Sequence, residues 1–209
     1  MESRKSIYFV LGGPGSGKGT FCTNMVNRYP ERFVHLSAGD LLRQFNREHD
    51  PLNSTDIQKE RFALIDRCIK EGLIVPAEIT IELLLEEVSR SKTNLFLIDG
   101  FPRNKDNYEG WCALSTKYKD IDVSGVLFLN CGEETMLKRI NKRAGESDEK
   151  RVDDNTEAFK KRINTFLNET VPIIKMYEKQ GYVVEINSEV DQKSMYLQLV
   201  ESKIIPDII

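Results

Sequence analysis

The chain has 209 residues, of which 40% are apolar and 30% are charged, and its formal net charge is −3. This length and composition predict one soluble globular domain, and the excess of acidic residues excludes a generally basic nucleic-acid-binding protein. The apolar runs are much shorter than the roughly 20 residues that cross a bilayer. Because the N-terminus also lacks the pattern of a signal or transit peptide, we expect a cytoplasmic or nuclear protein with no membrane partner.

Short apolar strands alternate with amphipathic helices along the chain, which indicates a parallel sheet covered on both faces. Strands are predicted at residues 6–11, 33–36, 94–98, 125–130 and 182–186. Helices are predicted at residues 20–29, 57–70, 78–88, 133–142, 155–179 and 191–203, and Pro172 should kink or split the fifth of these. Two polar segments, 44–55 and 143–154, interrupt this pattern and read as lids or loops.

The loop after the first strand carries the pattern G-x-x-x-x-G-K at residues 12–18 and leads into a helix. Glycines let backbone N–H groups turn toward phosphate oxygens, and the helix N-terminus adds a positive dipole. Lys18 supplies a mobile charge for the β- and γ-phosphates, and we expect its ammonium to be solvated when no ligand is bound. Thr20 takes the place of the usual hydroxyl residue, since Gly19 directly follows the lysine. The alternative is an ordinary glycine-rich turn.

Asp99 ends the third predicted strand, at the edge of the sheet where ligands bind in α/β proteins. Its carboxylate and the hydroxyl of Thr20 are candidate ligands of Mg²⁺, directly or through water; otherwise Asp99 caps the next loop. A zinc site is not expected, because the four cysteines form no C-x-x-C pair and only two histidines are present.

Five arginines occupy loop-like positions, where their guanidinium groups suit phosphate oxygens. They are Arg43, Arg103, Arg143, Arg151 and Arg162. A solvated charged surface is the alternative. No acid–base pair stands out, and a phosphate acceptor needs none because its oxygens are already anionic.

Several motifs together resemble the adenylate-kinase family of nucleoside monophosphate (NMP) kinases. They are GGPGSGKGT (12–20), HLSAGDLLR (35–43), EGLIVP (71–76), IDGFPRN (98–104) and RVDDN (151–155). The resemblance implies a P-loop, three-layer, doubly wound α/β domain over 1–209 with a parallel five-stranded sheet of order 2-3-1-4-5. It also implies an inserted NMP-binding lobe near 37–75, a short lid near 143–153 and a monomer that uses Mg²⁺ with ATP.

The resemblance also implies roles for individual residues. Lys18, Arg103, Arg143, Arg151 and Arg162 are the expected catalytic residues. ATP is expected to contact Gly15, Ser16, Gly17, Lys18, Gly19, Thr20, Arg143 and Tyr182. The monophosphate is expected to contact Ser37, Arg43, Leu73, Ile74, Val75, Gly100, Arg103, Asn104, Asn107, Arg151 and Arg162.

Within the family, Ala38, Asn104 and Asn107 are similar to the UMP-CMP kinase branch, which implies UMP or CMP as acceptor, with dCMP a further candidate. Asn can offer both a donor and an acceptor to a pyrimidine edge, although both asparagines can instead cap a turn. Residues 47–55 look inserted, and Phe62 falls where the family has a small glycine near the acceptor base, which predicts either a narrowed pocket or a shifted base. The alternatives are an adenylate kinase that uses AMP, a GTP-dependent switch protein and a nucleotide-binding module without activity.

Overall fold

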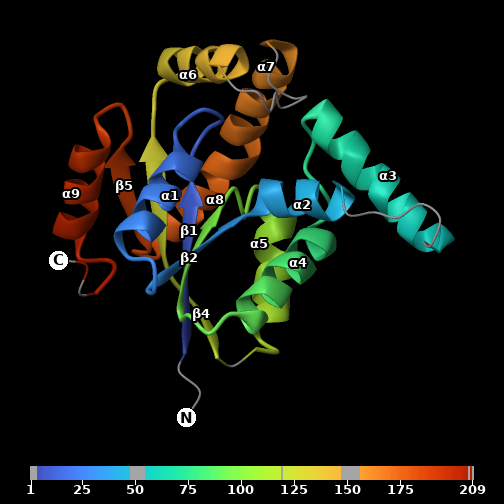
Figure 1. Ribbon diagram of the computed structural model, residues 1–209, viewed down its shortest axis with the longest axis horizontal. Helices are drawn as coiled ribbons and strands as arrows, with labels where there is room; N and C mark the ends of the chain where they lie inside the picture. Colours follow the sequence, from blue (N-terminus) through green and yellow to red (C-terminus); the bar gives the residue numbers. More distant parts are fainter. Residues whose placement is uncertain (1–3, 48–54, 119, 147–155, 207, 209) are drawn as a thin grey trace.

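A parallel sheet of five strands, in the order β2-β3-β1-β4-β5, forms the centre of the protein (Figure 1). The computed structural model describes residues 4–47, 55–118, 120–146, 156–206 and 208. The strands are β1 (Lys5–Leu11), β2 (Phe33–Ser37), β3 (Leu95–Asp99), β4 (Ile121–Asn130) and β5 (Val183–Asn187). All pairings are parallel, so the predicted fold class and strand order are confirmed.

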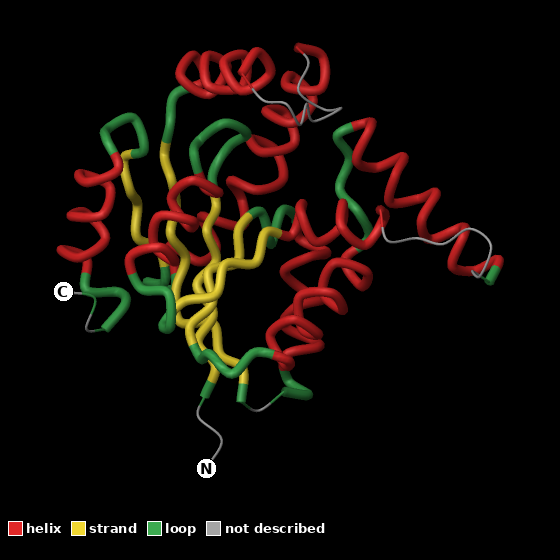
Figure 2. Tube along the Cα trace, viewed as in Figure 1, coloured by secondary structure: helices red, strands yellow, loops and turns green. Residues whose placement is uncertain are grey.

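Helices connect the strands and cover both faces of the sheet (Figure 2). They are α1 (Lys18–Arg28), α2 (Ala38–Arg47), α3 (Asp56–Glu71), α4 (Ala77–Arg90), α5 (Lys105–Ser115), α6 (Glu133–Glu146), α7 (Thr156–Thr165), the π-helical turn η1 (Phe166–Thr170), α8 (Val171–Lys179) and α9 (Gln192–Ser202). None of the helices in the described part of the chain is long and apolar enough to cross a membrane.

Alternate side chains of each strand enter two separate cores, as the two-residue repeat of a strand requires. Ile7 and Phe9 pack with α4, α5 and α8 on one face, where Trp111 is buried. Tyr8 and Val10 pack with α1 and α9 on the other face. Three layers, helix–sheet–helix, result from this alternation.

Two helix pairs lie outside the central layers and have small cores of their own. Leu42, Ile65 and Cys68 join α2 to α3, and α3 extends away from the sheet (Figure 1). Ile140 and Phe159 belong to the cluster that joins α6 to α7. We call these pairs the α2–α3 lobe and the α6–α7 lobe.

The sequence failed to predict two helices, α2 and α5, and the first four residues of β4. α2 begins directly after β2 without a loop, and the hydroxyl of Ser37 accepts a hydrogen bond from the N–H of Asp40 at 3.3 Å. The helix predicted at 155–179 is not split at Pro172: α7, η1 and α8 follow one another directly, and the π-helical turn η1 lies just before the proline, which has no N–H to give to the preceding turn.

Candidate active site

The carboxyl ends of the strands open into a cavity of about 790 Å³. Val10 and Ser37 both lie opposite Asp99 in the register of the sheet, so β1, β2 and β3 end at this edge. Both outlying lobes contribute to the walls as well, with residues such as Leu42 and Ile140. A site at this edge is where the topology of an open α/β sheet places a ligand.

The glycine-rich loop between β1 and α1 forms one wall of this cavity. Gly15 and Gly17 have φ angles of +83° and +91°, which favour glycine strongly. A Cβ atom on Gly15 would lie 2.5 Å from the carbonyl oxygen of Met136, so no larger residue fits here. The loop thus turns sharply into α1, whose N-terminal amides and dipole suit an anion.

Lys18 is tied to this loop, and the expectation of a solvated ammonium is therefore wrong. Its Nζ donates to the carbonyl oxygens of Gly12 and Gly13, each at 2.9 Å. Burial lowers the pKa of Lys18 to about 8, an effect that the negative charge of Asp99 partly opposes. The lysine is held in place before any nucleotide arrives.

Asp99 lies beside Lys18 at the end of β3 and is almost fully buried. His35 Nε2 lies 2.7 Å from Asp99 Oδ2, which fixes the orientation of the carboxylate. Cys22 completes a group whose potential ligand atoms all lie within 4.8 Å of one another. These three residues are distant in the sequence, so spacing alone did not reveal the group.

Arg103 is fixed at three points in the loop between β3 and α5. Its main-chain N–H donates to Asn107 Oδ1 at 3.1 Å, and its Nε donates to the carbonyl oxygen of Gly100 at 2.8 Å. Thr170 Oγ1 donates to its carbonyl oxygen at 2.7 Å. Asn104 Oδ1 accepts from the N–H of Asn107 and caps α5.

Most of the predicted site residues line this one cavity. They are Gly15, Gly17, Lys18, Gly19, Thr20, Ser37, Arg43, Leu73, Ile74, Val75, Asp99, Gly100, Arg103, Asn107, Arg143 and Arg162. The arginines come from different elements, namely α2, the β3–α5 loop, α6 and α7. The fold therefore collects cations that are far apart in the sequence.

Other predicted residues do not reach the cavity wall. Ser16 is fully buried beneath the loop, and Asn104 acts as a helix cap rather than as a wall residue. Arg151, with most of the predicted lid, lies outside the described residues, as does most of the segment 47–55.

Two of the expected residues lie away from the cavity wall. Tyr182 comes just before β5, and its carbonyl oxygen accepts from the N–H of Val126, so it lies at the amino edge of the parallel sheet, opposite the cavity. Phe62 packs against Phe45 inside the α2–α3 lobe, with ring centroids 5.0 Å apart, and is not among the residues that line the cavity.

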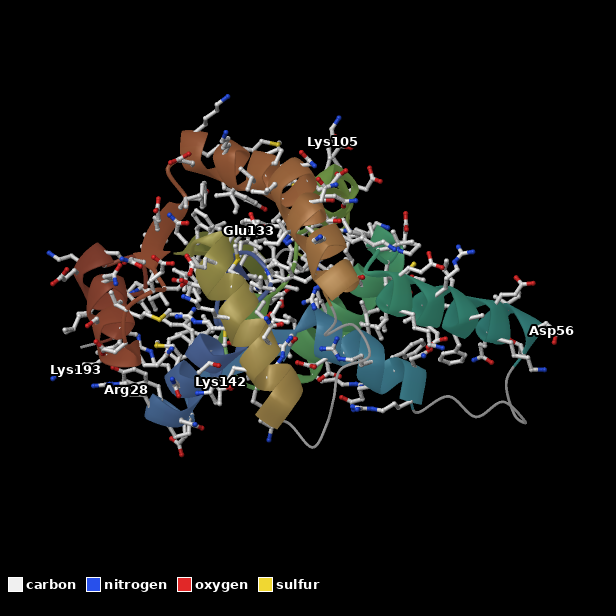
Figure 3. The ribbon with its side chains drawn as sticks, turned by 90° about the horizontal axis from the view of Figure 1, so that it is seen from above. Arg28, Asp56, Lys105, Glu133, Lys142 and Lys193 are labelled. Atoms are coloured by element: carbon white, nitrogen blue, oxygen red, sulfur yellow. The ribbon has the colours of Figure 1, made fainter. Side chains whose placement is uncertain are left out.

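Arg139 lines the cavity and was missed by sequence reasoning. Its guanidinium group donates to the carbonyl oxygens of Ser16 and Ser188 at 3.3 and 2.7 Å, which links the phosphate loop to the segment after β5. Arg139 belongs to α6, whose course from Glu133 to Lys142 can be followed in Figure 3. The only signal in the sequence was the excess of basic residues from 138 to 162.

A phosphate loop, a carboxylate at the end of β3 and converging arginines are features of kinases that act on phosphorylated acceptors. Residues 10–182 match the family model of adenylate kinase, and the chain belongs to this family. It is 42% identical to UMP-CMP kinase from Homo sapiens over 200 residues, which cover 93% of this chain and 95% of that protein. It is 46% identical to UMP-CMP kinase from Danio rerio, over 88% of this chain and 90% of that protein.

Proposed function

We propose that this protein transfers the γ-phosphoryl group of ATP to UMP and CMP and yields the corresponding diphosphates. One observation carries the proposal: a single cavity contains both the Lys18 phosphate loop and the four arginines Arg43, Arg103, Arg143 and Arg162. A single nucleotide does not need so many cations from separate elements. Two phosphate-bearing substrates, bound end to end, account for them.

The chemistry needs positioning and charge compensation rather than a general base. The loop amides and Lys18 hold the phosphates of ATP, while Arg103 and Arg162 approach from the β3–α5 loop and α7. Charge that spreads over the transferring group is stabilised by these fixed cations. His35 is engaged with Asp99, which agrees with a reaction whose nucleophile is already an anionic phosphate oxygen.

The oxygen donors near Lys18 fit a magnesium ion. Mg²⁺ prefers carboxylate, hydroxyl and water oxygens, and Asp99 and Thr20 present the first two in the cavity wall. We propose that these residues hold the ion, directly or through water. When bound, the ion neutralises phosphate charge. The hydrogen bond between His35 and Asp99 holds the Asp99 carboxylate in one orientation.

The pyrimidine preference is supported by Asn107 and by the UMP-CMP kinase relatives. Asn107 is almost fully buried and faces the cavity, and its Oδ1 is occupied by the N–H of Arg103. The amide therefore meets the base as an N–H donor, which matches O4 of uracil or N3 of cytosine. AMP is the acceptor to compare, because the wider family is that of adenylate kinase.

A coupled assay with ATP and each of UMP, CMP, dCMP and AMP tests this function. We expect the highest kcat/KM with UMP or CMP, and a loss with every monophosphate in Arg103→Ala. A higher kcat/KM with AMP would contradict the pyrimidine assignment and leave phosphoryl transfer standing. We also propose that the protein acts as a monomer, because one chain supplies all four arginines, and light scattering of the purified protein tests it.

A further inference from the structure

The rod formed by α7, η1 and α8 makes one contact with the Arg103 loop that the reaction as described does not use. Thr170 ends the π-helical turn η1 and is buried, and its Oγ1 donates to the carbonyl oxygen of Arg103 at 2.7 Å. Within a helix a threonine hydroxyl usually bonds to a carbonyl of its own preceding turn. Here it bonds across 67 positions of sequence to another element instead.

The same rod carries Arg162, one helical segment earlier. Residues eight positions apart in a regular α-helix, such as Arg162 and Thr170, are rotated by about 80° from one another. A π-helical turn closes hydrogen bonds over five residues and so takes more residues per turn. The η1 turn therefore rotates Thr170 back toward the face of Arg162.

The cavity walls agree with this geometry. Arg103, Arg162 and Thr170 all line a small side cavity of about 70 Å³ that also borders Gly12 and Lys18. The hydroxyl of Thr170 thus lies where the rod that bears one arginine meets the loop that bears another. Its hydrogen bond joins the side chain of Thr170 to the main chain of Arg103, so it links the two elements without using either guanidinium group.

We infer that Thr170 is a positioning residue for Arg103: its hydroxyl holds the Arg103 main chain in register with the rod that carries Arg162, so that both arginines meet the same transferring phosphoryl group. Asn107 fixes the N–H side of Arg103 and Thr170 fixes the carbonyl side. This inference rests on the proposed role of Arg103 toward the acceptor phosphate.

Thr170→Val tests the inference, because valine keeps the shape of threonine and replaces its hydroxyl with a methyl group. We expect kcat/KM for UMP and CMP to fall about tenfold, the size of one lost hydrogen bond to a buried group, with KM for ATP unchanged. Thr170→Ser keeps the hydroxyl and should restore most of the lost activity. Thr170→Ala serves as the second hydroxyl-free variant if the valine variant folds poorly by circular dichroism.

Thr116→Val is the matched control. Thr116 Oγ1 also donates to a carbonyl oxygen, that of Ala113, at 2.7 Å, but at the exposed end of α5 away from the cavity. The same chemical change there should leave the kinetics of all substrates unchanged.

A double-mutant cycle with Arg103→Ala separates the effect of Thr170 through Arg103 from the effect of Arg103 itself. If Thr170 acts through Arg103, Thr170→Val has no further effect once the arginine is absent. An equal loss in both backgrounds, an unchanged Thr170→Val enzyme, or a parallel rise of KM for ATP would overturn the positioning role. Full activity of Arg103→Ala alone would instead overturn the proposed function of Arg103.

Discussion

At the residue scale, Lys18 shows how a cation is prepared for a triphosphate. The ammonium already donates to the carbonyl oxygens of Gly12 and Gly13, so it does not have to be recruited from solvent. Lys18→Met should leave a folded protein, because methionine fills a similar volume and removes a partly buried charge. We expect kcat to fall by about 10²–10³, as when one preorganised electrostatic donor is deleted. Steady-state kinetics at saturating substrates measure this, and more than half of the parent kcat would refute it.

The depressed pKa of Lys18 also predicts a dependence of ATP binding on pH. Because burial lowers the pKa of Lys18 to about 8 in the free protein, the ammonium is mostly protonated at pH 7 and loses its proton as the pH rises through 8. ATP binds the protonated form, so its affinity should weaken above pH 8, approaching about tenfold per pH unit. Titration calorimetry between pH 7 and 10 measures this, and Lys18→Met should give a flat profile.

The same shift has a stability consequence of the opposite sense. Between about pH 8 and the ordinary value of 10.5 the unfolded chain binds more protons at Lys18 than the folded chain does. Stability therefore rises with pH across this window as far as this group is concerned. The buried lysine therefore lowers the stability of the ligand-free protein, which is typical of residues in functional sites.

Asn107 has two duties that a substitution must separate. Its Oδ1 accepts from the N–H of Arg103, so Asn107→Ala disturbs the loop as well as the base contact. Asn107→Asp keeps an oxygen for that N–H but removes the amide donor. We expect kcat/KM for UMP and CMP to fall by roughly tenfold to a hundredfold, since a buried base edge loses its partner, while ATP affinity without acceptor stays the same. An unchanged ranking of UMP, CMP and AMP would make Asn107 a loop residue only.

At the scale of elements, α3 begins with a capping box that stabilises the helix and so the α2–α3 lobe. Thr55 Oγ1 accepts from the N–H of Gln58, and Gln58 Oε1 accepts from the N–H of Thr55. Thr55→Ala should cost about 1 kcal/mol. Because the α2–α3 lobe has a core separate from the sheet, we expect faster hydrogen exchange in α3 and little change in the exchange of β1. Equal acceleration in both would show that the lobe and the sheet unfold together.

The elements with clear periodicity were predictable from the sequence. The contact between Phe9 and Trp111 could not be predicted, but β1, which carries Phe9, is an unambiguous apolar run. α5 was missed because Gly110 interrupts its pattern. A Cβ atom on Gly110 would lie 3.0 Å from Ile81 Cδ1, so the glycine allows α5 to approach α4 closely. Tertiary packing therefore favours glycine at this position, although glycine has a low helix propensity.

The candidate site was predictable where its residues form one contiguous sequence motif. The loop around Lys18 and the loop around Arg103 are examples, and both line the cavity. Arg139 was not predictable, because its partners Ser16 and Ser188 are brought to it only by the fold. The role of Tyr182 at ATP came from resemblance alone, although the predicted strand 182–186 already put this residue at the amino end of its strand.

At the scale of the whole molecule, the central sheet and the two lobes share one cavity. The α2–α3 lobe contributes Arg43, the α6–α7 lobe contributes Arg143 and Arg162, and the sheet contributes the phosphate loop. Asp56, at the start of α3, lies at the far tip of its lobe, well away from Glu133 and Lys142 on α6 (Figure 3). Lobes with their own small cores can move as units, which is the usual basis of closure around a substrate.

Such an arrangement predicts that water is a poor acceptor. If both lobes must close before Arg43, Arg143 and Arg162 surround the phosphates, ATP alone leaves the set incomplete, and the γ-phosphoryl group is transferred slowly. We expect ATP hydrolysis without acceptor to be at least about 10² slower than transfer to UMP, the order attributed to a missing electrostatic donor. Phosphate release and coupled kinase assays on the same preparation measure the two rates.

Uridine, which has the base but no phosphate, is the matched control. It should not raise the rate of ATP hydrolysis, since the arginines of the lobes have no second anion to bind. Hydrolysis as fast as transfer would show that the cationic set is complete without the acceptor.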